Sequence, residues 1–113
     1  MTTIADLNIR PAREPDVAEV TKLIADEGLV TDGIREHIGT FVVAFDGDRM
    51  VGCSGSEAYQ YAALIRSVAV LPEYRRMGLG RRLVRELLDR LASRGLREFY
   101  LLTIDAEAWF KKR

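Results

Sequence analysis

The sequence is poor in the residues that build disulfides and metal centres. Among its 113 residues it has one cysteine, Cys53, and one histidine, His37. A single cysteine excludes an intrachain disulfide framework and a cysteine-rich zinc module. No uninterrupted apolar run approaches the roughly 18 residues of a membrane span, and residues 1–10 lack the basic start and apolar middle of a signal peptide. We therefore expect a single cytoplasmic domain over residues 1–113, with no metal and no membrane contact.

The net charge of the chain is zero, but its two halves differ in sign. Residues 1–57 carry 11 acidic and 5 basic side chains, whereas residues 58–113 carry 6 acidic and 12 basic ones. The chain is therefore polar in charge rather than neutral throughout. Because a basic surface concentrates anions near it, the second half is expected to attract an anionic ligand.

The spacing of apolar residues predicts helices and strands in an α+β order. One helix enters at Glu14–Asp16 and stops near Gly28, and a longer one covers Leu79–Arg94. β-branched and aromatic residues predict strands over Ile9–Pro11, Thr40–Phe45, Met50–Tyr59, Leu64–Leu71 and Arg97–Leu102. Residues 33–39 are ambiguous between a loop and a second short helix, and residues 105–113 are expected to start a last helix. These elements predict a mixed sheet of about five strands flanked by helices.

The most informative stretch is Ser67–Leu83, SVAVLPEYRRMGLGRRL. A strand ends at a proline, a basic loop follows, and Gly78 and Gly80 bracket the start of the long helix. The first amides of a helix lack partners within it and favour an anion. A pyrophosphate would suit this site, and the alternative is a solvated basic helix face. A Walker loop is excluded because no Gly-Lys-Ser/Thr ending is present, and a dinucleotide fingerprint is excluded because Leu83 stands where its third glycine is needed.

The same stretch resembles the acyl-CoA signature of the GNAT superfamily of N-acetyltransferases. The matching pattern is Val68-Ala69-Val70-x-Pro72-x-Tyr74-Arg75-x-x-Gly78-x-Gly80. The resemblance implies that the main chain of Val68–Val70 pairs with the pantetheine arm of acetyl-CoA and that the amides from Arg76 to Arg81 hold its pyrophosphate. Thr103 lies where many members have an asparagine that touches the pantetheine. The implied acetyl-CoA residues are Val68, Ala69, Val70, Arg75, Arg76, Met77, Gly78, Leu79, Gly80, Arg81 and Thr103.

A narrower resemblance concerns Leu64–Val70 and Leu101–Glu107, which are similar to a GNAT subgroup found with bacterial arsenic-resistance genes. It implies acetylation of a small amine, such as an amino-acid-like toxin. The implied reaction is attack of a deprotonated amine on the acetyl thioester. Phe110 occupies the position of the usual tyrosine acid, so a tyrosine acid at that site is excluded. Because a thiolate with a pKa near 8.5 departs without a strong acid, catalysis is not excluded.

Few side chains are candidates for the acceptor side of the site. Glu57 is the nearest carboxylate for a catalytic base, and the alternative is a surface carboxylate on a half-exposed strand. Arg66 and Ser67 are candidates for contacting an anionic substrate, and a salt-bridged Arg66 is the alternative. Cys53 is interpreted as a small strand residue rather than a nucleophile, and His37 as structural or exposed rather than a base.

The resemblance also implies strands beyond the last predicted helix. Family members continue with two further strands, so the fold predicted for residues 1–113 lacks the usual last two. An incomplete sequence, a true truncation and a sheet completed by another chain are the open explanations, and the last would make a homodimer through the open edge. A non-catalytic acyl-CoA-binding module is the alternative to an enzyme. Nucleic-acid binding by the arginines of residues 75–97 would require steep salt dependence, and we expect no such partner.

Overall fold

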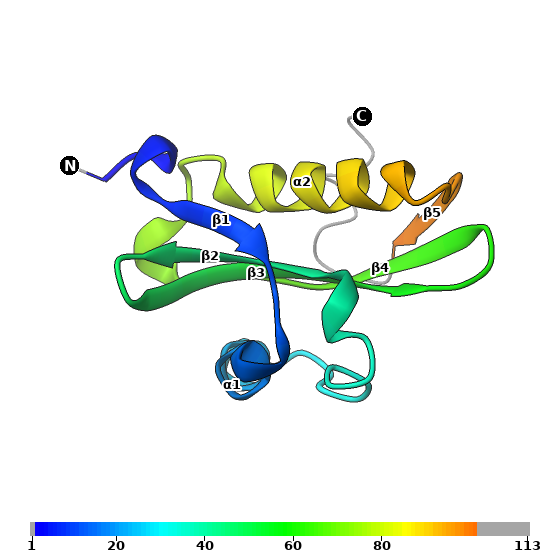
Figure 1. Ribbon diagram of the computed structural model, residues 1–113. Helices are drawn as coiled ribbons and strands as arrows, with labels where there is room; N and C mark the ends of the chain where they lie inside the picture. Colours follow the sequence, from blue (N-terminus) through cyan, green and yellow to red (C-terminus); the bar gives the residue numbers. More distant parts are fainter. Residues whose placement is uncertain (1, 102–113) are drawn as a thin grey trace.

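The computed structural model describes residues 2–101, which fold into three layers (Figure 1). A five-stranded sheet forms the middle layer, helix α2 lies along one of its faces, and helix α1 lies against the other. The elements follow in the order β1 (Asn8–Pro11), α1 (Val17–Asp26), β2 (Phe41–Asp46), β3 (Arg49–Ala58), β4 (Ala62–Val70), α2 (Leu79–Ser93) and β5 (Glu98–Leu101).

The sheet is mixed, and its strands lie side by side in chain order. Strands β1 to β4 pair antiparallel, and β5 pairs parallel to β4 after the crossover through α2. The turn Asp46–Arg49 closes the β2–β3 hairpin, where Gly47 adopts a positive φ of 60°. This arrangement confirms the α+β fold class and, over residues 2–101, the order of helices and strands along the chain that the sequence predicts.

Two apolar cores form because each helix buries one stripe of side chains against the sheet. Helix α1 buries Val17, Val20, Leu23 and Ile24. Helix α2 buries Leu79, Leu83, Val84, Leu87 and Leu91. The central strand β3 contributes to both cores, with Cys53 on the α1 side and Val51 on the α2 side. A continuous buried run from Met50 to Ser56 is the result.

Residues 33–39 do not form a second α-helix. They make turns followed by a 3₁₀ turn at Ile38–Thr40. Gly33 adopts a φ of 79°, a left-handed conformation that interrupts a helix. The helix expected over residues 105–113, together with Thr103 and Phe110, lies outside the described residues. Within residues 2–101, no helix is long and apolar enough to cross a membrane.

Candidate functional site

Strand β4 carries an extra residue halfway along its length. Cys53 pairs with Ala69 and Gly55 pairs with Arg66, so two steps on β3 correspond to three on β4. Ser67 takes up the difference with a φ of 58°, a conformation that only a few per cent of non-glycine residues adopt. Because of the bulge, the end of β4 at Val68–Val70 pairs with β3 in a register that is shifted by one residue from the register before the bulge.

Among the described residues, β4 pairs with β5 only before this bulge. It covers Ala62 to Ile65 on β4. From Arg66 to Val70, no strand among the described residues lies on the β5 side of β4. Main-chain groups on an open strand edge bind other extended chains. Within residues 2–101, the predicted pantetheine segment, Val68–Val70, therefore has no strand beside it on that side.

The loop that follows β4 presents backbone amides at the start of α2. Arg76 has a φ of 64° and Gly78 a φ of 83°, and such alternations turn successive N–H groups toward a common point. No side chain within the described part of the chain caps this helix. A Cβ added at Gly80 would meet nothing closer than 3.9 Å, so packing within the protein does not require glycine there. We call the main chain of residues 76–81 the amide cradle. Its N–H groups fit an anion that approaches the main chain.

Arg75 lies beside this cradle and is engaged with the protein. Its Nε donates to the carbonyl of Val70 at 3.0 Å, and its guanidinium pairs with Glu27 at the end of α1. The side chain thus links β4, the loop and α1. Arg76, Met77 and the first residues of α2 follow directly, so the predicted pyrophosphate residues, 76–81, run from the loop into the first turn of α2.

Arg66 lies buried on the α1 face of the sheet, next to the bulge. Its side chain is 7% exposed. Its Nε donates to the Ser67 hydroxyl at 3.0 Å, one terminal nitrogen to the Glu57 carboxylate at 2.7 Å, and the other to the carbonyl of Val30 at 2.9 Å. A guanidinium carries five N–H groups, so two have no acceptor among the described residues. The salt-bridged alternative for Arg66 is thereby confirmed, and Glu57 is its partner.

Glu57 is held as a carboxylate. Tyr59 donates its hydroxyl to Oε1 at 2.6 Å, and Arg66 donates to Oε2. The hydrogen bond from Tyr59 and then that from Arg66 lower the pKa of Glu57 below its ordinary value. The same hydrogen bond raises the pKa of Tyr59. Glu57 is 20% exposed on its side chain, so it is more accessible than Arg66.

Cys53 lies directly under the bulge and is fully buried. Its thiol donates to the carbonyl of Ser67 at 3.3 Å. Burial raises the pKa of Cys53 to about 12, so the thiol stays protonated at neutral pH and is a poor nucleophile. Among the described residues, no group of three or more His, Cys, Asp or Glu side chains could hold a metal ion.

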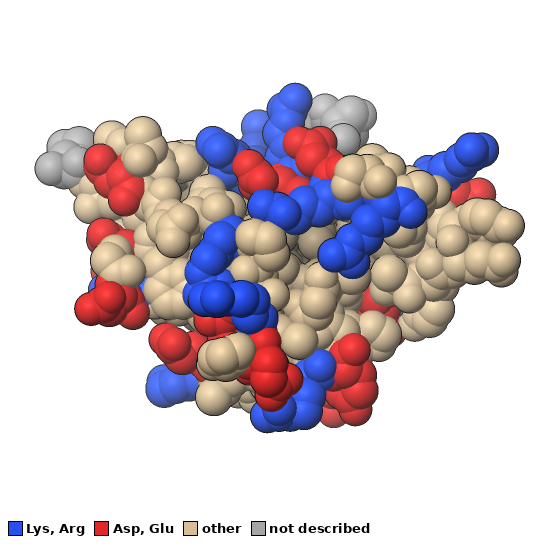
Figure 2. Space-filling model, in the orientation of Figure 1, with Lys and Arg blue, Asp and Glu red and all other residues tan. Residues whose placement is uncertain are grey.

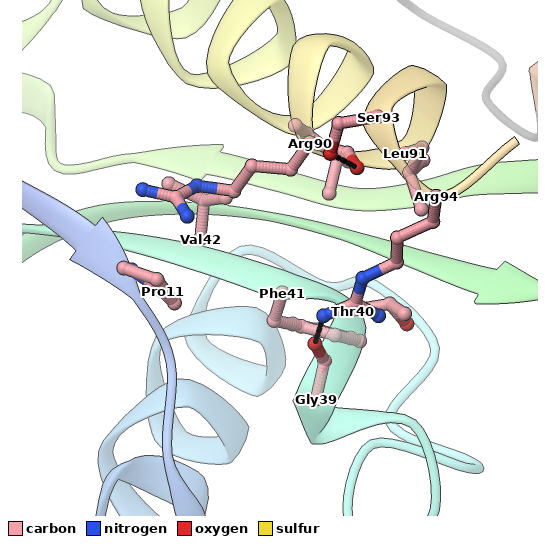
Figure 3. A pocket seen from close by; sticks show the side chains of 10 residues that line it. Pro11, Gly39, Thr40, Phe41, Val42, Arg90, Leu91, Ser93 and Arg94 are labelled. Carbon is pink, nitrogen blue, oxygen red and sulfur yellow. Dashed lines mark hydrogen bonds between the residues drawn. The ribbon is translucent and has the colours of Figure 1, made fainter.

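A separate hollow of about 120 Å³ lies at the other end of α2 (Figure 3). Its lining includes Pro11 and Thr40 from the sheet side and Arg90 and Arg94 from the helix. Arg94 donates to the carbonyl of Gly39 at 3.4 Å across it. Because α2 starts at the cradle and ends at this hollow, the two are different places on the molecule.

On the face seen in Figure 2, many Lys and Arg side chains lie over α2, with Asp and Glu side chains among them. Both signs of charge also occur around α1 on this face.

The structure brings together the residues that the sequence predicts for each half of the site. Residues 76–81 form the cradle, Val68–Val70 form the end of β4 that precedes it, and Glu57, Arg66 and Ser67 form one cluster. The sequence offers Tyr59 as a residue that lines a substrate site or caps a sheet edge, but it did not predict the hydrogen bond from Tyr59 to Glu57. Sequence reasoning missed the carbonyl of Val30, for which the sequence left no signal.

Comparison with known proteins identifies relatives over nearly the whole chain. The family model described as "Acetyltransferase (GNAT) family" matches residues 2–112. An uncharacterized N-acetyltransferase of Chlorobaculum tepidum is 35% identical over 116 residues, which cover 96% of this chain and 74% of that protein. An amino-acid acetyltransferase of Neisseria meningitidis serogroup A is 25% identical, covering 96% of this chain. This chain spans only 27% of that enzyme's length.

Solved structures share the fold. N-acetylglutamate synthase from Neisseria gonorrhoeae, crystallized with coenzyme A and L-arginine, superposes with a TM-score of 0.80 at 23% identity. The match covers 95% of this chain and 26% of that one. The protein Rv2747 from Mycobacterium tuberculosis, crystallized in complex with CoA, has a TM-score of 0.77 at 25% identity, covering 93% of this chain and 69% of its own.

Proposed function

Because the chain belongs to the acetyltransferase (GNAT) family, we propose that it transfers the acetyl group of acetyl-CoA to the amine of a small molecule. The observation that carries this proposal is the edge of β4 between the bulge at Ser67 and the amide cradle at the start of α2, beside which no strand lies among residues 2–101. Residues 66–70 span about 13 Å of extended chain, enough to align a pantetheine arm. The edge leads from the predicted pyrophosphate site to the cluster around Arg66.

The cradle and the edge would hold the two ends of the cofactor in different ways. The amides of residues 76–81 and the N-terminus of α2 favour the charge of the pyrophosphate. The main-chain groups of Val68–Val70 would pair with the pantetheine amides. An N–H of this segment is also the candidate for stabilising the oxyanion that forms when the amine attacks the thioester.

We propose that the acceptor amine lies at the Glu57–Arg66 cluster. In the reaction, the amine nitrogen bonds to the acetyl carbon, the carbon–sulfur bond breaks, and the amine proton leaves while the CoA sulfur gains one. The lowered pKa makes Glu57 a weaker base than an ordinary carboxylate and keeps it ionised at neutral pH. It is therefore suited to hold and orient an ammonium group, which then loses its proton to water.

The charges of the cluster favour an acceptor that also carries an acidic group. Arg66 has two N–H groups without an acceptor in the described chain, and the Ser67 hydroxyl lies beside them. An α-amino acid presents the matching ammonium and carboxylate. The name of the Neisseria meningitidis relative, amino-acid acetyltransferase, supports this class. An amino-acid-like toxin met in arsenic resistance is the finer proposal, and its support is the short match at Leu64–Val70.

The test is calorimetric titration with acetyl-CoA, followed by a thiol-release screen of amino acids and their toxic analogues. Gly80→Glu places a charged side chain in the cradle without a clash inside the protein, since an added Cβ has 3.9 Å of clearance. We expect it to weaken acetyl-CoA binding by about a hundredfold. Ala92→Glu, exposed near the far end of α2, is the matched control and should bind normally.

Each outcome decides one part of the proposal. Wild-type protein that does not bind acetyl-CoA refutes the cofactor site. Equal affinities of Gly80→Glu and Ala92→Glu place the cofactor elsewhere. Binding without thiol release for any amine in the screen would favour a non-catalytic acyl-CoA-binding module instead.

We also propose that β5 pairs with the same strand of a second copy. Its support is the exposure of Phe99 and Tyr100, at 38% and 57%, on a strand with one described neighbour. A monomer mass by light scattering at high concentration would refute this homodimer.

A further inference from the structure

Tyr74 is the last residue of the 3₁₀ turn η4 (Pro72–Tyr74), directly before the cradle. Its hydroxyl donates to Oδ2 of Asp46 at 2.5 Å. Asp46 lies 28 residues earlier, where β2 enters its hairpin turn with β3. A hydrogen bond to a carboxylate is shorter and stronger than one between neutral groups. It connects the segment that precedes the cradle to a paired part of the sheet.

Two weaker contacts join the same two segments. Arg49 pairs with Glu73 at 3.0 Å, and its guanidinium lies 5.9 Å from the centre of the Tyr74 ring. Both members of the ion pair are more than half exposed, so the pair adds little to stability. The ring of Tyr74 is partly buried against the α2-side core. Tyr74 therefore carries most of the connection.

The cradle needs support from its flanks because its own conformation is unfavourable. Arg76 has a positive φ, which costs about 1 kcal/mol for a residue with a Cβ. The downstream flank is fixed by α2, whose Leu79 is buried. On the upstream side, Tyr74 lies two residues from Arg76. A small rotation of η4 would therefore move the amides that face the anion.

We propose that Tyr74, acting through Asp46, is a positioning residue for the anion cradle. It contacts no reacting atom, and its role is to hold the amides of residues 76–81 in the geometry that binds pyrophosphate. The inference depends on the proposed function, since it takes those amides as the pyrophosphate site of acetyl-CoA.

The decisive variant is Tyr74→Phe, which keeps the ring and removes only the hydroxyl. We expect its Kd for CoA, measured by calorimetry, to rise about tenfold. ADP, which carries the pyrophosphate without the pantetheine arm, should lose the same factor. The melting temperature should stay close to that of the wild type, because most of the ring burial is retained.

Tyr100→Phe is the matched control. It also removes a tyrosine hydroxyl that donates to a carboxylate, Glu98 at 2.9 Å, but on β5. Its affinity for CoA should equal that of the wild type. Asp46→Ala should reproduce the loss seen for Tyr74→Phe, and the double variant should lose no more than either one, because both remove the same hydrogen bond.

The outcomes separate this inference from the proposed function. Wild-type protein that binds neither CoA nor ADP overturns the proposed site and this inference with it. Wild-type binding with an unchanged Kd in Tyr74→Phe overturns the inference alone. Additive losses in the double variant, or a loss for CoA without one for ADP, also overturn it.

Discussion

Asp16 shows how one side chain stabilises the junction between β1 and α1. Arg10 binds both of its carboxylate oxygens, at 2.8 and 3.0 Å, and the N–H of Arg13 donates to it at 2.7 Å. Asp16 is 6% exposed. The hydrogen bond from Arg10 is the main cause that lowers the pKa of Asp16 below its ordinary value of 3.8. The folded protein therefore favours the charged form.

A prediction about acid stability follows from the direction of that shift. Because the folded pKa is lowered, the stabilisation is complete above the ordinary pKa and is lost as the pH falls through the folded one. Asp16→Asn should lower the free energy of unfolding by about 2 kcal/mol at pH 7. The difference from wild type should shrink below about pH 4, as denaturant titrations across the pH range would show.

Asp26→Asn is the control for this prediction. Asp26 pairs with Lys22 on the surface, where its side chain is 59% exposed. Its removal should cost at most about 0.5 kcal/mol at any pH. A difference for Asp16→Asn that stays constant down to pH 2 would contradict the assigned ion pair.

The residue types in the sequence predicted how single side chains such as Cys53 behave, but not which side chains contact one another. Cys53 is a small buried strand residue, as the sequence predicts, because a lone thiol in an apolar run packs like other small side chains. The Glu57–Arg66 pair was not foreseen. It depends on the register that sets Glu57 opposite Leu64 and on the bulge at Ser67, and neither is encoded in local spacing.

At the scale of elements, Gly55 shows how closely β2 and β3 pack. A Cβ at Gly55 would lie 2.3 Å from the Phe41 ring, whose side chain is buried at the start of β2. Such a contact forces the ring or the strand to move. Glycine is therefore required here by the partner strand rather than by its own backbone angles.

Gly55→Ala should lower the free energy of unfolding by about 2 kcal/mol or more, because overpacking of a core is costly. Gly39→Ala, where an added Cβ meets nothing within 4 Å, should change stability little. Phe41→Leu should recover part of the loss when combined with Gly55→Ala, because it removes the ring that the new methyl group meets. Denaturant unfolding of the wild type, Gly55→Ala, Gly39→Ala and the double variant measures these free energies of unfolding. No recovery in the double variant would contradict the assigned contact.

The strands and helices were predictable because each has its own periodic pattern. The two amphipathic helices and the strands of the sheet appear where apolar spacing and turn residues predict them. The bulge in β4 and the bond between Tyr74 and Asp46 were not predictable. The bulge depends on the register between β3 and β4, and the bond joins residues 28 apart in the chain, so neither can be derived from local sequence.

At the scale of the whole molecule, the net charge is zero although residues 58–113 carry 12 basic and 6 acidic side chains. On the face seen in Figure 2, side chains of both signs lie over α2 and around α1. Because a zero net charge gives no long-range attraction, an anion at the cradle is attracted mainly by the charges close to it, such as those of Arg75 and Arg76.

The affinity for CoA should therefore depend on salt through local charges. Raising NaCl from about 0.05 to 0.5 M shortens the Debye length to a few Å and should raise the Kd for CoA about three- to tenfold. Arg76→Gln, in the cradle, should weaken binding at low salt and flatten the salt dependence. Arg94→Gln, an exposed arginine near the opposite end of α2, should leave the slope unchanged. Equal dependence of the Kd on NaCl concentration in the two variants would mean that the anion is attracted by the combined field of many arginines. A salt dependence that flattens only in Arg76→Gln would mean that the anion binds at the cradle.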